Sequence, residues 1–223
     1  MIEAVRSGLA SLGDPKIAID QQRYMKSAMP FRGVRVPDVR ALVRIIVHSN
    51  PLSDRATWEA TILELWDGAE FREERYAATF AAGHRRYRPF QDPDAIPLYE
   101  HMVVTGAWWD HVDTIAAHLI GPIQRSHRPA LDATMRAWAT DGDRWRRRTA
   151  IIHQLGARDA TDTQLLTDVI VPNLADGDFF IRKGIGWALR EYARTAPDWV
   201  RSFVAGHADA MSPLSRREAT KHL

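Results

Sequence analysis

An indole and a carboxylate stand one helical turn apart in the middle of the chain. The segment 108–113 reads Trp-Trp-Asp-His-Val-Asp, and on a helix Trp109 and Asp113 share a face because residues four apart are neighbours. Trp108 falls about 100° away and is free to face the core. An aromatic face attracts a cation, and a carboxylate stabilises positive charge developing beside it. The pair therefore predicts a site for a cationic ligand or transition state. The alternative is two core tryptophans beside solvated aspartates.

A stripe of basic and aromatic residues follows further along the chain. Its members, at positions i, i+4, i+7 and i+11 of a predicted helix, are Lys183, Trp187, Arg190 and Arg194. Aromatic residues interleaved with cations hold phosphates and sugar or base faces, so the stripe predicts a phosphate-binding surface. The alternative is a core Trp187 beside a solvated basic edge. Gly184 and Gly186 cost this helix about 1 kcal/mol each, which predicts close approach by another helix or by a ligand backbone.

A turn glycine followed three residues later by a large aromatic recurs along the chain. The pairs are Gly68 and Phe71, Gly106 and Trp109, Gly142 and Trp145, and Gly177 and Phe180. The glycines are 38, 36 and 35 residues apart, a period typical of helical solenoids. Equivalent side chains then line up on one surface. The repeat predicts an all-α solenoid of stacked antiparallel helix pairs with a concave face.

The glycine repeat also relates the charged residues to one another. Arg148 and Lys183 each follow their turn glycine by six residues, whereas Asp113 follows its glycine by seven. Of the three consecutive arginines that end at Arg148, only one can point where Asp113 points. The predicted concave surface therefore holds a carboxylate flanked by cations and two indoles.

Helical patterns account for nearly the whole chain, without alternating strand patterns or hairpin signals. The predicted helices span 38–48, 53–66, 70–86, 94–104, 108–119, 129–139, 143–155, 162–173, 179–193 and 197–206. Ser53 is the expected N-cap of the second. The sequence Ser-Arg-Arg-Glu at 215–218 has the capping-box pattern for a short final helix. Short links favour a single domain over 1–223.

Composition excludes several kinds of chemistry. The 223 residues carry a net charge of +2 and contain no cysteine, so disulfides, thiol catalysis and cysteine-bound metals are excluded. The nine histidines lack a metal-ligand spacing, and no phosphate-binding glycine loop or nucleophile elbow is present. We therefore expect no metal site. No apolar run is long enough to cross a bilayer, and the N-terminus lacks the shape of a signal peptide, which favours a cytoplasmic protein.

Several segments together resemble the AlkD-type DNA alkylation repair glycosylases. They are 22–26, 64–67, 108–113, 148–151, 185–193 and 214–219. The likeness runs over nearly the whole chain in the family's order, and the segments at 108–113 and 185–193 are the most distinctive. It implies HEAT-like helical repeats with a concave, basic DNA-binding face, and a bacterial enzyme acting in the cytosol or nucleoid.

The resemblance also assigns roles to individual residues. It implies a catalytic cluster of Trp109, Asp113 and Trp187, with Arg148 on the DNA backbone near the lesion. Further expected DNA contacts are Tyr24, Lys183, Arg190 and Arg194. The implied activity is excision of cationic N3- and N7-alkylpurines from duplex DNA without flipping the base into a pocket. We expect a monomeric, monofunctional glycosylase of base excision repair that needs no cofactor and no membrane.

Two other functions fit the same sequence. Solenoids of this kind also serve as non-catalytic scaffolds that bind peptides in their concave face. A protein that recognises branched or damaged DNA without cutting the glycosidic bond would carry similar basic and aromatic residues. Retention on duplex DNA separates the first alternative from the glycosylase, and activity on 7-methylguanine DNA separates the second.

Overall fold

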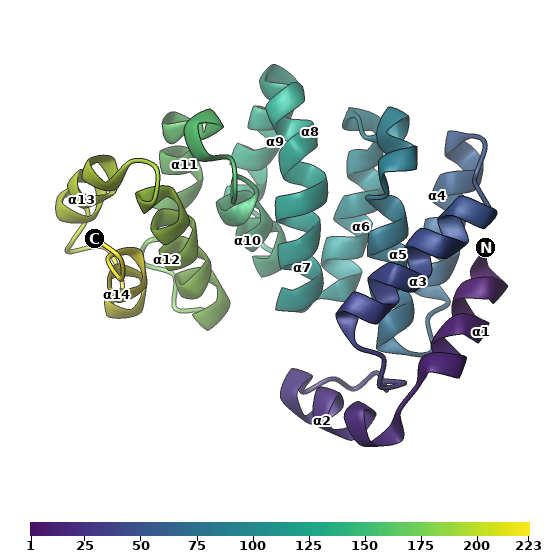
Figure 1. Ribbon diagram of the computed structural model, residues 1–223. Coiled ribbons are helices and arrows are strands. Elements are labelled where there is room, and N and C mark those ends of the chain that lie inside the picture. Colours follow the sequence, from purple (N-terminus) through teal and green to yellow (C-terminus); the bar gives the residue numbers. More distant parts are fainter. The chain divides into compact units, whose positions relative to one another are not determined.

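The computed structural model describes residues 1–223 and contains α-helices, short 3₁₀ turns and one π-helical segment, without strands (Figure 1). The all-α fold predicted from the sequence is confirmed. The chain divides into two compact units, Met1–Gln91 and Asp92–Leu223, and a single functional domain over 1–223 stays a prediction. None of the helices combines the length and the apolar character that a bilayer crossing requires.

The first unit is a bundle of five helices. They are α1 (Ile2–Leu12), α2 (Pro15–Met25), α3 (Val36–Ser49), α4 (Arg55–Asp67) and α5 (Arg72–Ala82), followed by the 3₁₀ turn η1 (Arg85–Phe90). Its core includes the fully buried Trp58, Trp66 and Tyr87. The buried Glu73 carboxylate accepts backbone N–H groups of residues 32–34 and so fixes the connection between α2 and α3.

The second unit contains the remaining nine α-helices. They are α6 (Ile96–Gly106), α7 (Trp109–Ile115), α8 (Gly121–Ser126), α9 (Arg128–Ala139), α10 (Arg144–Ile152), α11 (Thr163–Ile170), α12 (Phe179–Ala193), α13 (Pro197–Gly206) and α14 (Pro213–Ala219). Short 3₁₀ turns lie at Pro93–Ala95, Arg158–Ala160 and Val171–Asn173. The π-helical segment η3 (Ala116–Ile120) joins α7 to α8, so the three run on as one rod (Figure 1).

Two Asp-Gly-Asp turns start α10 and α12 in the same way. In each turn the first aspartate accepts the backbone N–H of the second, at 2.7 Å for both Asp141 and Asp176. The second aspartate, Asp143 or Asp178, then caps the helix by accepting two N–H groups of its first turn. Because side-chain oxygens satisfy the free N–H groups at a helix start, this turn fixes where each helix begins.

Several predicted helix boundaries are wrong, and three of them show why. Asp54, not Ser53, caps α4, and the Ser53 hydroxyl donates to the Asp54 carboxylate instead. The predicted helix 70–86 ends at Ala82 and continues as the separate turn η1. The final helix is capped by Ser212, so Ser215 lies inside it. An aspartate or serine beside a cap has the same local chemistry as the cap, and only tertiary packing separates them.

Candidate active site

A buried ion pair joins α7 to α10 at the centre of the second unit. The Arg148 guanidinium donates to both carboxylate oxygens of Asp113, Nε to Oδ1 at 2.7 Å and Nη2 to Oδ2 at 2.9 Å. Its Nη1 donates to the backbone carbonyl of Phe180 in the first turn of α12. The two side chains are 5% and 13% exposed. A bidentate pair fixes the plane of the carboxylate, so Arg148 holds Asp113 in one orientation.

The positions at which α7, α10 and α12 begin set the alignment of their charged residues. Asp113, Arg148 and Lys183 each lie five residues after the N-cap residue of α7, α10 and α12. Counted from the turn glycines, Asp113 was one position out of register with the other two. The register is set by the cap rather than by the glycine. The three side chains therefore occupy one repeated position on the equivalent helices α7, α10 and α12.

Glycines bring the helices of this site close together. A Cβ atom on Gly121, at the start of α8, would lie 2.1 Å from the carbonyl oxygen of His153. A Cβ atom on Gly184 would lie 3.2 Å from Nη1 of Arg148. Gly121 lets the rod that carries Asp113 approach the end of α10, and Gly184 leaves space on α12 for the Arg148 guanidinium. The predicted close approach at Gly184 is confirmed.

The environment of Asp113 opposes its charge. Burial raises the pKa of the Asp113 carboxyl above its ordinary value, and the hydrogen bonds and charge of Arg148 offset part of that rise. Desolvation disfavours the charged form of an acid, whereas a neighbouring cation favours it. A carboxylate held in this way interacts strongly with any positive charge that comes near, because little water screens it.

The two adjacent tryptophans differ in their surroundings. Trp108 packs against the rings of Trp145 and Phe180, with centroids 6.3 and 5.4 Å away, but it is half-buried and does not lie in the core. Trp109 is partly exposed at the first position of α7, one turn before Asp113. Helical spacing places the Trp109 indole on the same face as the Asp113 carboxylate.

A carboxylate from α14 holds the basic stripe of α12. Glu218 pairs with Lys183, Nζ to Oε1 at 3.1 Å, and also with the Arg190 guanidinium. Trp187 is partly exposed and lies between the two cations on the same helix face. The hydrogen bond from Lys183 is the main reason why the pKa of Glu218 lies below its ordinary value, and Arg190 adds to the effect.

The contact between α12 and α14 depends on Gly186. A Cβ atom there would lie 2.5 Å from Cβ of Glu218 and 3.1 Å from the carbonyl oxygen of Ser215. The predicted close approach by another helix is thus confirmed. The Ser215 hydroxyl donates to the carbonyl of Arg182 at 2.9 Å, which fastens the same two helices. The sequence did not indicate this role of Glu218, because its spacing from Ser215 matches a capping box.

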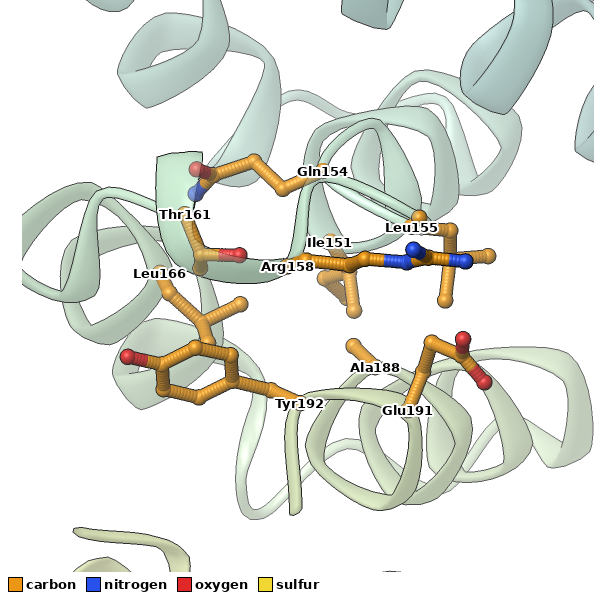
Figure 2. Close-up of a pocket in the computed structure, with 10 residues that line it drawn as sticks. Ile151, Gln154, Leu155, Arg158, Thr161, Leu166, Ala188, Glu191 and Tyr192 are labelled. Carbon is orange, nitrogen blue, oxygen red and sulfur yellow. The ribbon is translucent and has the colours of Figure 1, made fainter. Parts of the chain in front are cut away.

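A small pocket lies on another side of α12. It is formed by the end of α10, the connection to α11, and Ala188, Glu191 and Tyr192. Arg158 and Glu191 reach towards the same side of this pocket (Figure 2). None of the predicted site residues lines it, so the cluster around Asp113 is a surface of neighbouring helices that is separate from this pocket.

The comparison with protein families is decisive. The family model for DNA alkylation repair enzymes matches residues 5–223. The chain belongs to this family. Among curated protein sequences no match is found.

Two solved structures are similar to this chain. A predicted DNA alkylation repair enzyme from Enterococcus faecalis is 27% identical, with a TM-score of 0.84, and the match covers 95% of this chain and 96% of that one. AlkD2 from Streptococcus mutans is 15% identical, with a TM-score of 0.63, over 85% of this chain and 90% of that one. The second likeness concerns the fold.

The structure brings together some predicted site residues and separates others. Asp113 and Arg148 are in direct contact, and Lys183 and Arg190 share Glu218. Arg194 is exposed and pairs with Glu191 at 3.2 Å. Their contacts with DNA stay predictions.

Tyr24 and the histidines are the candidates that lie outside these clusters. Tyr24 lies in the last turn of α2 in the first unit and is 75% exposed. No group of three or more His, Asp or Glu side chains is arranged to hold a metal ion. His153 is fully buried, and burial lowers its pKa to about 4, so it is neutral at physiological pH.

Proposed function

We propose that this repair enzyme is a monofunctional DNA glycosylase that hydrolyses the N-glycosidic bond of N3- and N7-alkylpurines in duplex DNA. The observation that carries the proposal is the buried Asp113 carboxylate, which Arg148 holds in a fixed orientation on the same helix face as a partly exposed indole. Such a group stabilises a sugar cation better than a solvated carboxylate does, because it is already oriented and poorly screened.

The proposed reaction does not need a general acid to protonate the leaving base. Alkylation at N3 or N7 makes the purine cationic, and the electron pair of the breaking bond to C1′ neutralises it. Asp113 stabilises the oxocarbenium-like sugar and orients the water that adds to C1′, whose proton passes to the carboxylate or to solvent. Trp109 and Trp187 hold the deoxyribose through their ring faces. No general acid and no base-enclosing pocket are required in this scheme.

A covalent mechanism through Lys183 is disfavoured by its surroundings. A lysine that forms a Schiff base must present its amine to the sugar carbon. The Lys183 Nζ instead pairs with the Glu218 carboxylate at 3.1 Å. Lys183 therefore suits a phosphate contact beside Arg190, and water is the nucleophile in the proposed reaction.

Release of base from single-lesion duplexes tests the proposal. We expect excision of 7-methylguanine and 3-methyladenine under single-turnover conditions, and no excision of uracil or hypoxanthine, whose neutral bases leave poorly. Tight duplex binding without release of any alkylated base would support a non-catalytic DNA-binding protein instead. Efficient excision of uracil would show that the leaving base is activated by a group that this proposal lacks.

A further inference from the structure

An open hollow in the first unit is lined almost entirely by basic side chains. It lies between the C-terminal end of α3 and the turn η1. Its charged and imidazole-bearing members are Arg44, His48, His84, Arg85, Arg86 and Arg88, together with Ile45 and Ser49. No carboxylate lines it. Four guanidinium groups around one hollow repel one another in the absence of an anion.

These arginines differ from several others in the same unit. Arg6, Arg23, Arg32 and Arg55 each have a carboxylate within ion-pair distance. By contrast, none of the arginines that line the hollow makes an ion pair, and all four are exposed. Folding has thus left this cluster without internal counter-charge. Arginine forks match phosphate oxygens in geometry as well as in charge.

The hollow is separate from the position of Tyr24. The connection that follows Tyr24 is tied to the N-terminal end of α5, where Arg72 donates to the Ser27 hydroxyl at 3.2 Å. The hollow instead lies beyond the C-terminal end of the same helix, where His84 follows Gly83. Eleven helical residues separate the two ends by about 16 Å. A ligand in the hollow is therefore not the DNA contact expected of Tyr24.

Ile45, the apolar residue of the hollow, favours a nucleic-acid backbone over a small inorganic anion as the ligand. Ile45 is 61% exposed at its rim, one residue after Arg44. A small inorganic anion would use the guanidinium groups alone, whereas a nucleic-acid backbone offers sugars for apolar contact between successive phosphates. The open shape also suits a chain of phosphates better than one enclosed anion.

We infer that this hollow is a second binding site for the phosphate backbone of duplex DNA, outside the lesion site. The inference rests on the proposed DNA substrate, and it adds a contact that does not depend on lesion or sequence. Each phosphate neutralised by an arginine releases counterions, so the site contributes to the salt dependence of binding. Its function is to retain the enzyme on DNA, while the cluster around Asp113 carries out the chemistry.

The test uses the full chain with Arg44→Ala and Arg88→Ala combined, one substitution from each wall of the hollow. On undamaged duplex DNA of about three helical turns, we expect weaker binding and a slope of log K against log salt reduced by about two. Excision of 7-methylguanine at saturating enzyme should stay at the wild-type rate. The matched control combines Arg136→Ala and Arg201→Ala, which removes the same charge from exposed arginines already paired with aspartates, and should leave the slope unchanged.

Two further measurements keep the inference separate from the proposed function. Replacing the same two arginines by lysine keeps the charge and should preserve most of the salt slope, which excludes misfolding as the cause of a loss. An alanine variant with wild-type affinity and slope would overturn the inference, whatever the enzyme excises. If instead the wild type released no base while the alanine variant lost affinity, the glycosylase proposal would fail and the second site would stand.

Discussion

Two carboxylates in the second unit each hold basic side chains, yet they are built differently. Asp113 is 13% exposed and faces one guanidinium, and burial raises its pKa. Glu218 is similarly shielded, but it faces two cations that are themselves more accessible, and its pKa is lowered. The ionised form of Asp113 is therefore disfavoured by folding, whereas the ionised form of Glu218 stabilises the folded protein. Ionisable groups that burial destabilises in this way are common in active sites.

The largest expected effect is on Asp113. Asp113→Asn keeps the shape of the side chain but removes the charge that we expect to stabilise the sugar cation. Single-turnover excision of 7-methylguanine should fall by roughly 10²-fold or more. DNA binding, measured by fluorescence anisotropy, should change little. A near-normal excision rate in a folded variant would sink the catalytic role of Asp113.

A smaller loss is expected when Arg148 is removed. Arg148→Ala takes away the charged hydrogen bonds that orient Asp113, and we expect excision to fall by about tenfold to a hundredfold. The pKa of Asp113 should rise further, so the acid limb of the pH–rate profile should move to higher pH. If Arg148 also contacts a phosphate, the salt slope of binding falls by about one. An unchanged acid limb would show that Arg148 does not act through Asp113.

Glu218 should affect binding rather than chemistry. Glu218→Gln removes the anion that now occupies Lys183 and Arg190, so both cations become available to DNA phosphates. We expect affinity for duplex DNA to increase by up to about fivefold, the equivalent of about 1 kcal/mol for partly exposed pairs. Asp198→Asn, which frees only the exposed Arg201, is the matched control. Weaker binding in the Glu218 variant would mean that the glutamate positions these cations instead of competing for them.

The smallest effect concerns the pH dependence of stability. Because the pKa of Glu218 is lowered in the folded protein, its contribution is present above its ordinary pKa and is lost as pH falls through the folded value. Asp113 has the opposite sign, since a raised pKa makes stability decrease as pH rises through the interval. Urea unfolding from pH 3 to 7 should show the stability gap between wild type and Glu218→Gln shrinking in acid, by about 1 kcal/mol at most. A gap independent of pH would contradict this assignment.

The sequence predicted helices best where a cap and a stop were both explicit. The helices at 179–193 and 197–206 were predicted with their exact bounds, because Asp178 and Pro197 are strong local signals. The helix at 70–86 was not, because the prediction ran past Gly83, the C-cap residue of α5. Glycine commonly ends a helix, but it is a weaker signal than an N-cap aspartate or a helix-starting proline.

The sequence indicated which residues form the site but not all of the ion pairs between them. The spacing placed Trp109 with Asp113 and indicated that only one arginine of three would point towards Asp113. The structure confirms that this is Arg148, because Arg146 and Arg147 pair elsewhere. The ion pairs of Glu218 were not predictable, because they depend on how α14 packs on α12. Contacts between distant segments have no local signature.

The absent side chain at Gly186 controls the charge of this surface. A methyl group there would collide with Glu218 and with the Ser215 carbonyl, so α14 would have to shift outward. The carboxylate would then move away from Lys183 and Arg190, although neither cation nor the carboxylate had been altered. The uncharged substitution Gly186→Ala would therefore change the electrostatic potential of this surface. The distance between α12 and α14 therefore sets how much unpaired positive charge α12 presents at its surface.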